Sequence, residues 1–277
     1  MEMGTPLERE DGTDYLWLNI RELPFFRGLL RSIEARFYQD IDLEQPVLDL
    51  GCGDGHFTAT TFKSPLQVGL DPSGKAVRTA VRYGAHQFVV QGSGCRLPFP
   101  DGYFKAAISN SVLEHIPNLE QEISEMERVL SPGALFVFSV PNQNFTRNLS
   151  VSSFFERIGL GCIAKAYRSL FNRISRHHHC DPPEAWIDRM QASGFRVEQH
   201  WNYFSPRATR CFEWGSYLGI PSLLPHFLFD RWILVSKRWN FVFVLPLLRR
   251  IYREEPRHPH GSYTFYIARR VEKFDKI

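Results

Sequence analysis

Apolar residues along the chain follow two alternating patterns. Short, nearly continuous apolar runs recur, and segments with apolar residues at helical spacing lie between them. The first run, Val47–Leu50, is broken only by Asp49 and ends at a turn with glycine at positions 51, 53 and 55. The later predicted strands are 66–71, 87–91, 106–110, 130–142, 195–200 and 263–271, the last of which alternates. Buried strands that alternate with amphipathic helices predict the α/β class with a mostly parallel sheet.

The glycine turn after the first strand is the strongest candidate for a ligand site. Without a Cβ, glycine lets a ligand approach the backbone closely, and a helix starting near Asp54 would direct free N–H groups toward the turn. The spacing here is G-x-G-x-G, whereas the dinucleotide fingerprint is G-x-G-x-x-G. Asp49, directly below the turn, would repel a pyrophosphate but suits a ligand with an ammonium and a sulfonium. S-adenosylmethionine has both groups.

Asp71 ends the second strand, 20 residues after Gly51. In a βαβ unit this position lies beside the ribose, where a carboxylate accepts hydrogen bonds from both hydroxyl groups. The alternative is a helix N-cap without a ligand.

Three further segments carry a resemblance to a known family. Residues 92–104 (GSGCRLPFPDGYF) are similar to the segment G-D-A-x-x-L-P-F-P-D-x-x-F of class I S-adenosylmethionine-dependent methyltransferases of the ubiquinone/menaquinone type. Residues 110–116 (NSVLEHI) and 130–142 (LSPGALFVFSVPN) resemble later segments of the same family, so the likeness is nearly continuous from Val47 to Asn142. One departure is Ser93, which stands where the family usually has an acid that binds the adenine amine.

The resemblance implies a Rossmann-like, doubly wound sheet of seven strands, mostly parallel, with an antiparallel last strand at its edge and added helical insertions. It also implies which residues hold the cofactor. The expected cofactor-binding residues are Asp49, Gly51, Cys52, Gly53, Asp71, Pro72, Gly92, Ser93, Gly94, Cys95, Asn110 and Ser111. His115 is the first candidate for a catalytic base, although in similar proteins this histidine is more often structural.

We divide the chain into a core with three additions. Residues 1–45 are expected to form N-terminal cap helices, which either cover the sheet or reach the cofactor through Tyr15 or Arg27. The expected methyltransferase core comprises 46–142, 181–202 and 259–277; a helical insertion spans 143–180, and an aromatic and basic helical lid spans 203–258.

The run His177–Cys180 invites interpretation as a metal site, because it places four ligand-type side chains in a row. Adjacent residues cannot all face one ion, and metal ligands usually come as spaced pairs from rigid elements. We therefore expect a solvated loop or a pocket rim here, and no metal site.

Charge is distributed unevenly along the chain. Residues 201–277 carry a surplus of seven cations although the whole chain has a net charge of only +3, and the aromatic residues also concentrate there. The segment 203–258 therefore either packs on the domain or on a second subunit of a homodimer, or forms an amphipathic lid that contacts a membrane or encloses a lipophilic acceptor. Its basic residues alternate with large apolar ones, which argues against nucleic-acid binding.

Cysteine use and the N-terminal residues bear on the compartment. The five cysteines include no C-x-x-C pair, and the polar start MEMGTPLEREDG is unlike a signal peptide. The longest clean apolar run, 241–248, is interrupted by Pro246 and too short to span a bilayer. We expect a cytoplasmic protein that works at the inner face of the membrane if the lid contacts lipid.

The function expected from the sequence is methyl transfer from S-adenosylmethionine to oxygen or carbon of a small-molecule or lipid-like substrate. The first alternative is a methyltransferase-like binding or scaffold protein without activity, for which Ser93 is the main argument. A dinucleotide-dependent oxidoreductase is disfavoured by Asp49 and by the glycine spacing.

Overall fold

A computed structural model gives the fold, and it describes residues 12, 14–219, 227–228, 232–233, 235 and 237–271. Its sheet has seven strands in the order β3-β2-β1-β4-β5-β7-β6. The strands are β1 (Val47–Leu50), β2 (Leu66–Asp71), β3 (His86–Gln91), β4 (Phe104–Asn110), β5 (Leu130–Pro141), β6 (Phe195–Tyr203) and β7 (Tyr263–Arg270). The expected Rossmann-like fold with an antiparallel last strand is confirmed, because β7 is antiparallel to both of its neighbours.

One detail of that expectation was wrong. β7 is not an edge strand; it lies between β5 and β6, and β6 forms the edge. The first four residues of β7 are all buried, as expected of a strand paired on both sides. Alternating, β-branched residues are typical of antiparallel strands in either position, so the sequence pattern did not distinguish them.

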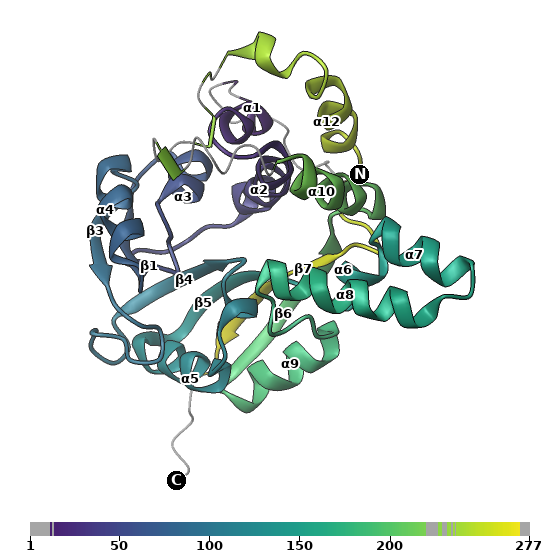
Figure 1. The fold of residues 1–277 in the computed structure, drawn as a ribbon. Coiled ribbons are helices and arrows are strands. Elements are labelled where there is room, and N and C mark those ends of the chain that lie inside the picture. The colour runs from purple at the N-terminus through teal and green to yellow at the C-terminus, as the bar shows by residue number, and fades with distance from the viewer. Residues whose placement is uncertain are drawn as a thin grey trace, which may run out of the picture.

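Helices cover both faces of the sheet (Figure 1). The helices before β5 are α1 (Tyr15–Ile20), α2 (Phe25–Phe37), α3 (His56–Thr61), α4 (Gly74–Tyr83) and α5 (Leu119–Val129), with 3-10 turns η1 (Tyr38–Asp40) and η2 (Leu113–His115). Those after β5 are α6 (Asn144–Arg147), α7 (Ser150–Arg157), α8 (Gly161–Ser175), α9 (Pro183–Ala192), α10 (Pro206–Leu218) and α12 (Leu245–Tyr252), with η4 (Arg238–Phe241).

The two faces of the sheet contribute to separate cores, as the alternation of side chains along a strand requires. In β4, Ala106 and Ile108 belong to a core shared with α1, α2 and α12, whereas Ala107 belongs to a core shared with α5 and α9. Both faces of the central strands are therefore buried in apolar cores, which explains why their sequences are continuous apolar runs.

The cap helices begin where the sequence places capping residues. Asp14 accepts hydrogen bonds from the N–H groups of Leu16 and Trp17 at the start of α1, and Pro24 precedes the first turn of α2. The Asp14 carboxylate also pairs with Arg249 of α12 at 3.0 Å. The N-terminal cap is thus tied to a helix from the far end of the chain.

Strand order also determines where a ligand can bind. From β1 the chain moves to β2 and β3 on one side, while β4 and β5 lie on the other side. At such a switch point the loops after neighbouring strands diverge, and a crevice opens at the carboxyl ends of β1 and β4.

Candidate functional site

The glycine turn after β1 is packed against the loop after β4. The backbone N–H groups of Gly51 and Cys52 both donate to the Leu70 carbonyl of β2, at 2.8 and 3.0 Å. Gly51 has a φ of 74°, and a Cβ placed there would lie 2.4 Å from Cγ1 of Val112. Only glycine satisfies both constraints. Helix α3 starts at His56, two residues later than expected, and Asp54 accepts a hydrogen bond from the His56 N–H.

Asp49 is buried beneath this turn and is held from two sides. Its Oδ2 accepts a hydrogen bond from the Thr58 hydroxyl at 2.5 Å and lies 2.8 Å from Nε2 of His86. The His86 ring reaches it across β2 at Gly69, where a Cβ would lie 2.9 Å from the ring. Within the described residues Oδ1 of Asp49 has no partner, so one carboxylate oxygen is left for a ligand.

Asp71 connects the second strand to the glycine turn. Its Oδ2 accepts from the Gly53 N–H at 3.0 Å, and its Oδ1 accepts from the Ser73 N–H at 2.8 Å. The N-cap of α4 is Ser73, whose hydroxyl accepts from the Ala76 N–H, so Asp71 is not the helix cap. Each carboxylate oxygen keeps a lone pair for a hydroxyl donor.

The loop after β3 lies beside Asp71. The Gly92 N–H donates to the Asp71 carbonyl, and the Gln91 side chain donates to the carbonyl of Pro72. Ser93 accepts from the Cys95 N–H through its hydroxyl.

Beneath that loop lies Glu122 of α5, which is buried against Gly94. This burial raises the pKa of the Glu122 carboxyl to about 7, and the Cys95 thiol contacts it at 3.9 Å.

A carboxylate from the cap organises the end of β4. Glu34 of α2 is fully buried, and its Oε2 accepts from Arg31 at 2.8 Å and from the Asn110 amide at 2.6 Å. Its Oε1 accepts from the hydroxyls of Ser111 and Tyr203, at 3.0 and 2.7 Å. The side chains of Asn110 and Ser111 are therefore positioned by the cap.

These elements enclose a pocket of about 780 Å³, within the range of small-molecule sites. Among the expected cofactor residues, those that line it are Asp49, Gly51, Cys52, Gly53, Asn110 and Ser111. The others are not part of its lining: Asp71, Pro72, Gly92, Ser93, Gly94 and Cys95, together with His115.

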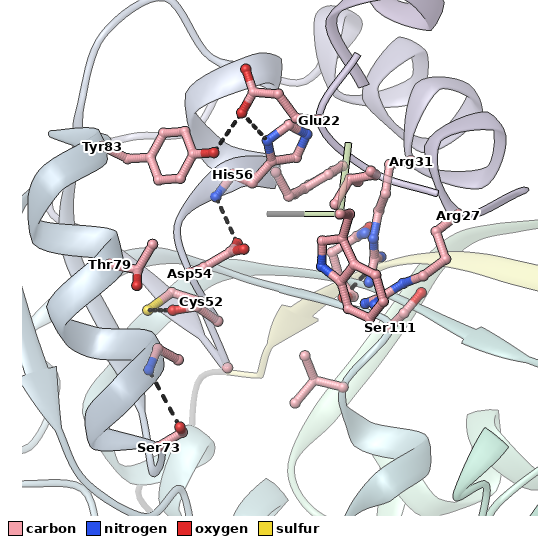
Figure 2. A pocket seen from close by; sticks show the side chains of 18 of the residues that line it. Glu22, Arg27, Arg31, Cys52, Asp54, His56, Ser73, Thr79, Tyr83 and Ser111 are labelled. Atoms are coloured by element: carbon pink, nitrogen blue, oxygen red, sulfur yellow. Dashed lines mark hydrogen bonds and ion pairs between the residues drawn. The ribbon is translucent and has the colours of Figure 1, made fainter. Parts of the chain in front are cut away.

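Two arginines of α2, Arg27 and Arg31, lie at one end of the pocket (Figure 2). We call it the arginine end, and its other residues are Asn110, Ser111 and Trp232. Arg27 is exposed toward the pocket, and desolvation by the surrounding protein lowers the pKa of its guanidinium. Its partner among the described residues is the Trp232 ring, 5.9 Å away. Burial also opposes the charge of Arg31, but the Glu34 carboxylate outweighs it and raises the pKa.

Glu22 closes the opposite side of the pocket. Figure 2 shows it between His56 and Tyr83, whose hydroxyl donates to Glu22 at 2.5 Å. Nδ1 of His56 lies 3.4 Å from the same carboxylate. The nearby His56 imidazole lowers the pKa of Glu22 to about 2, despite partial burial. The linker between α1 and α2 is thereby attached to α3 and α4.

His115 lies in η2, next to the loop after α8. Its Nδ1 donates to the Arg176 carbonyl at 2.9 Å, which leaves the lone pair on Nε2. Arg176 ends α8 with a φ of 56°, and this left-handed cap brings His177 against His115, with ring centroids 5.4 Å apart. Burial lowers the pKa of His115, lowers that of His177 to about 3 and raises that of Glu114 to about 8.

The sequence singled out some pocket residues and missed others. Of the two cap residues considered, Arg27 lines the pocket, whereas Tyr15 is fully buried in the core. Among the residues missed, Glu22, Arg31, His56 and Tyr83 line the pocket, whereas Glu34 and His86 hold residues of its lining. For Glu34 a signal existed, because it follows Leu30 by four residues on the apolar face of α2.

Comparison with known proteins agrees with this geometry. Residues 48–138 match the family model described as a methyltransferase domain. Residues 48–138 therefore form a methyltransferase domain. An uncharacterized methyltransferase of Mycobacterium sp. (strain JLS) is 36% identical over 94 residues, which cover 34% of this chain and 37% of that protein. The match thus spans little more than a third of the length of that relative.

Solved structures with the same fold have low sequence identity to this chain. Geranyl diphosphate C-methyltransferase from Streptomyces coelicolor, solved with Mg²⁺, geranyl diphosphate and S-adenosyl-L-homocysteine, superposes with a TM-score of 0.55 at 15% identity, over 90% of this chain and 82% of that one. A possible histamine N-methyltransferase from Thermotoga maritima gives 0.53 at 14% identity, over 89% and 91%. The fold is that of S-adenosylmethionine-dependent methyltransferases.

Proposed function

We propose that this protein transfers a methyl group from S-adenosylmethionine to oxygen or carbon of a small or lipophilic acceptor. The observation that carries the proposal is the Asp71 carboxylate bound to the Gly53 N–H, at the edge of a pocket that also receives Asp49. The Asp71 carboxylate would accept from the ribose hydroxyls, and the Asp49 carboxylate would bind the ammonium. This donor set suits a cationic nucleoside ligand and opposes a pyrophosphate.

The cofactor site extends over three loops. The turn Gly51–Gly53 lines the pocket, so its backbone can contact the cofactor. The adjoining loops contribute Asp71, Pro72 and Gly92–Cys95. With Ser93 in place of an acid, the adenine amine is bound there by a hydroxyl or by backbone groups. Asn110 and Ser111 lie at the methionine side, where Glu34 fixes their orientation.

The acceptor is assigned to the arginine end. S-adenosylmethionine, when bound, supplies a methyl group already activated on a sulfonium sulfur. The protein's task is to orient the acceptor, exclude water and remove a proton where the acceptor carries one. The ring of Trp232 and the guanidinium of Arg27 suit an acceptor with an apolar body and a negatively charged or polarised oxygen. The Nε2 lone pair of His115, in η2 after Ser111, is the candidate proton acceptor.

In the segment 203–258, the residues that the structure describes support a lipophilic acceptor; the parts of the predicted lid at 220–226, 229–231, 234 and 236 lie outside them. Phe243 is 93% exposed, Phe227 86%, Leu218 71% and Trp239 67%, and the neighbouring Arg250 and Arg253 carry positive charge. Apolar and aromatic side chains beside arginines are typical of surfaces that contact anionic bilayers. None of the helices in the described part of the chain is long and apolar enough to cross a membrane. We infer reversible contact with a lipid surface through this segment.

Calorimetric titration with S-adenosylhomocysteine tests the cofactor. We expect micromolar binding by the wild type and at least a tenfold loss in Asp71→Ala. Asp101→Ala is the matched control, because Asp101 is 81% exposed and pairs only with Arg128 among its described neighbours. Absence of binding by a folded wild type would refute the proposal and favour a scaffold role.

A further inference from the structure

A compact group of ligand-type side chains lies outside the pocket lining, where η2 meets the end of α8. Glu114, His115 and His177 each offer one donor atom, and these three atoms lie within 4.8 Å of one another. Glu114 and His115 follow Ser111 and Val112, which line the pocket. The group therefore adjoins the arginine end.

Glu114 is a buried acid, and one of its side-chain oxygens is unpaired among the described residues. The residue is 1% exposed, and its Oε2 has no hydrogen-bond partner within the described part of the structure. The nearby Arg31 does not compensate it, because its guanidinium is paired with Glu34 at 2.8 Å. Burying an unpaired carboxylate is costly, and such groups in proteins are usually paired or bound to a metal.

The two histidines are held in a form suited to a cation. The Arg176 carbonyl accepts the Nδ1 hydrogen of His115, so its Nε2 lone pair faces Glu114, with 3.8 Å between Nε2 and Oε1. A backbone carbonyl on the second ring nitrogen is the usual support of a metal-bound histidine. His177 is held in turn by the Cys180 thiol, whose Sγ lies 3.7 Å from its Nδ1.

We propose that Glu114, His115 and His177 bind a divalent transition-metal cation beside the acceptor. Donor atoms on one ion lie roughly 3 to 4 Å apart, so the observed separations need only small side-chain rotations. Two imidazoles and one carboxylate favour Mn²⁺, Fe²⁺, Co²⁺, Ni²⁺ or Zn²⁺ over Mg²⁺ and Ca²⁺. This assigns His115 as a ligand instead of a free base, and departs from our expectation of no metal site.

The arrangement also suggests what the cation would do. Three protein ligands leave coordination positions open for water or for an oxygen of the acceptor. A hydroxyl bound there would lose its proton to solvent more easily, because the cation stabilises the oxyanion. This role rests on the proposed methyl transfer, whereas the metal site itself does not.

The test uses the full chain without a polyhistidine tag, freed of metal with EDTA. Titration with Co²⁺ is followed by visible absorption, and titration with Zn²⁺ by calorimetry. We expect one ion per chain at micromolar affinity or tighter. Both Glu114→Gln, which keeps the shape of the side chain, and His177→Ala should weaken binding at least tenfold. His178→Ala is the matched control, because its imidazole lies outside the cluster.

The outcomes separate the metal site from the cofactor site. Melting temperature and titration with S-adenosylhomocysteine show whether each variant is folded. Absence of saturable Co²⁺ and Zn²⁺ binding by the wild type overturns the proposal, and so does equal binding by His177→Ala, Glu114→Gln and His178→Ala. Neither result affects binding of S-adenosylhomocysteine, whose loss would count against the proposed function alone.

Discussion

Replacing Glu34 with glutamine tests whether the cap organises the site through one buried charge. The substitution keeps the size of the side chain, and the hydroxyls of Ser111 and Tyr203 can reverse to accept from its amide group. Arg31 and Asn110 can still donate to the remaining oxygen. What is removed is the negative charge opposite Arg31, at a position where the Glu34 side chain is 0% exposed and that of Arg31 19%.

The size of the effect follows from that burial. Removing one partner of a buried ion pair costs about 3 to 5 kcal/mol, since the other charge stays behind uncompensated. Arg31 retains some solvent through the pocket and keeps its bond to the Asn110 carbonyl. We therefore expect Glu34→Gln to lower the free energy of unfolding by about 3 kcal/mol.

Urea unfolding followed by tryptophan fluorescence measures this quantity. Glu198→Gln is the control: it removes a carboxylate that pairs with Arg269 at 2.8 Å, but both side chains are partly exposed. Such pairs contribute about 0 to 1 kcal/mol. If the two variants lose the same stability, the buried carboxylate is not what holds the cap to the strands.

Three further predictions concern other parts of the molecule. Burial raises the pKa of Glu122 from 4.5 to about 7, so its contribution to stability is complete below pH 4.5 and is lost as the pH rises through 7. In urea unfolding, the free energy of unfolding of Glu122→Gln should rise by about 3 kcal/mol relative to wild type between pH 4.5 and pH 8. A difference that does not change with pH would contradict this. Gly51→Ala should abolish binding of S-adenosylhomocysteine in calorimetry, since the new Cβ meets Val112 at 2.4 Å; Gly84→Ala, with a similar φ and open space, should cost about 1 kcal/mol of stability but no affinity. Replacing Trp239 and Phe243 with serine should reduce cosedimentation with phosphatidylserine vesicles about tenfold, whereas Phe154→Ser, on α7, should not. An equal loss in both variants would indicate non-specific hydrophobic binding. A concentration-dependent dimer in size-exclusion chromatography would indicate a subunit contact.

Much of the core was predictable because its physical requirements are local. A buried parallel strand needs a continuous apolar run, and a tight turn near a ligand needs glycines, so β1 and the residues 51–55 stand out in the sequence alone. Asp71 was found through its spacing from Gly51, and the structure adds that it binds the turn itself.

The parts that escaped prediction depend on contacts between distant segments. The sequence marks Glu34 only as a polar residue on the apolar face of α2; its role depends on the hydroxyl of Tyr203 and the amide of Asn110, which come from distant segments. Likewise, His177 was judged against its neighbours in the run 177–180, whereas its actual neighbours, Glu114 and His115, come from η2. Periodicity within one segment does not identify the partner that a distant segment supplies.

The bonds of Glu34 also bear on how this architecture is divided into modules. Similarity to the methyltransferase family model begins at residue 48, yet Asn110, Ser111 and Tyr203 all depend on a carboxylate that precedes this point. A fragment cut at the family boundary would inherit several polar groups of the site without their shared acceptor. Cap and core are thus one unit for recombination, and a chimaera that exchanges either must exchange both.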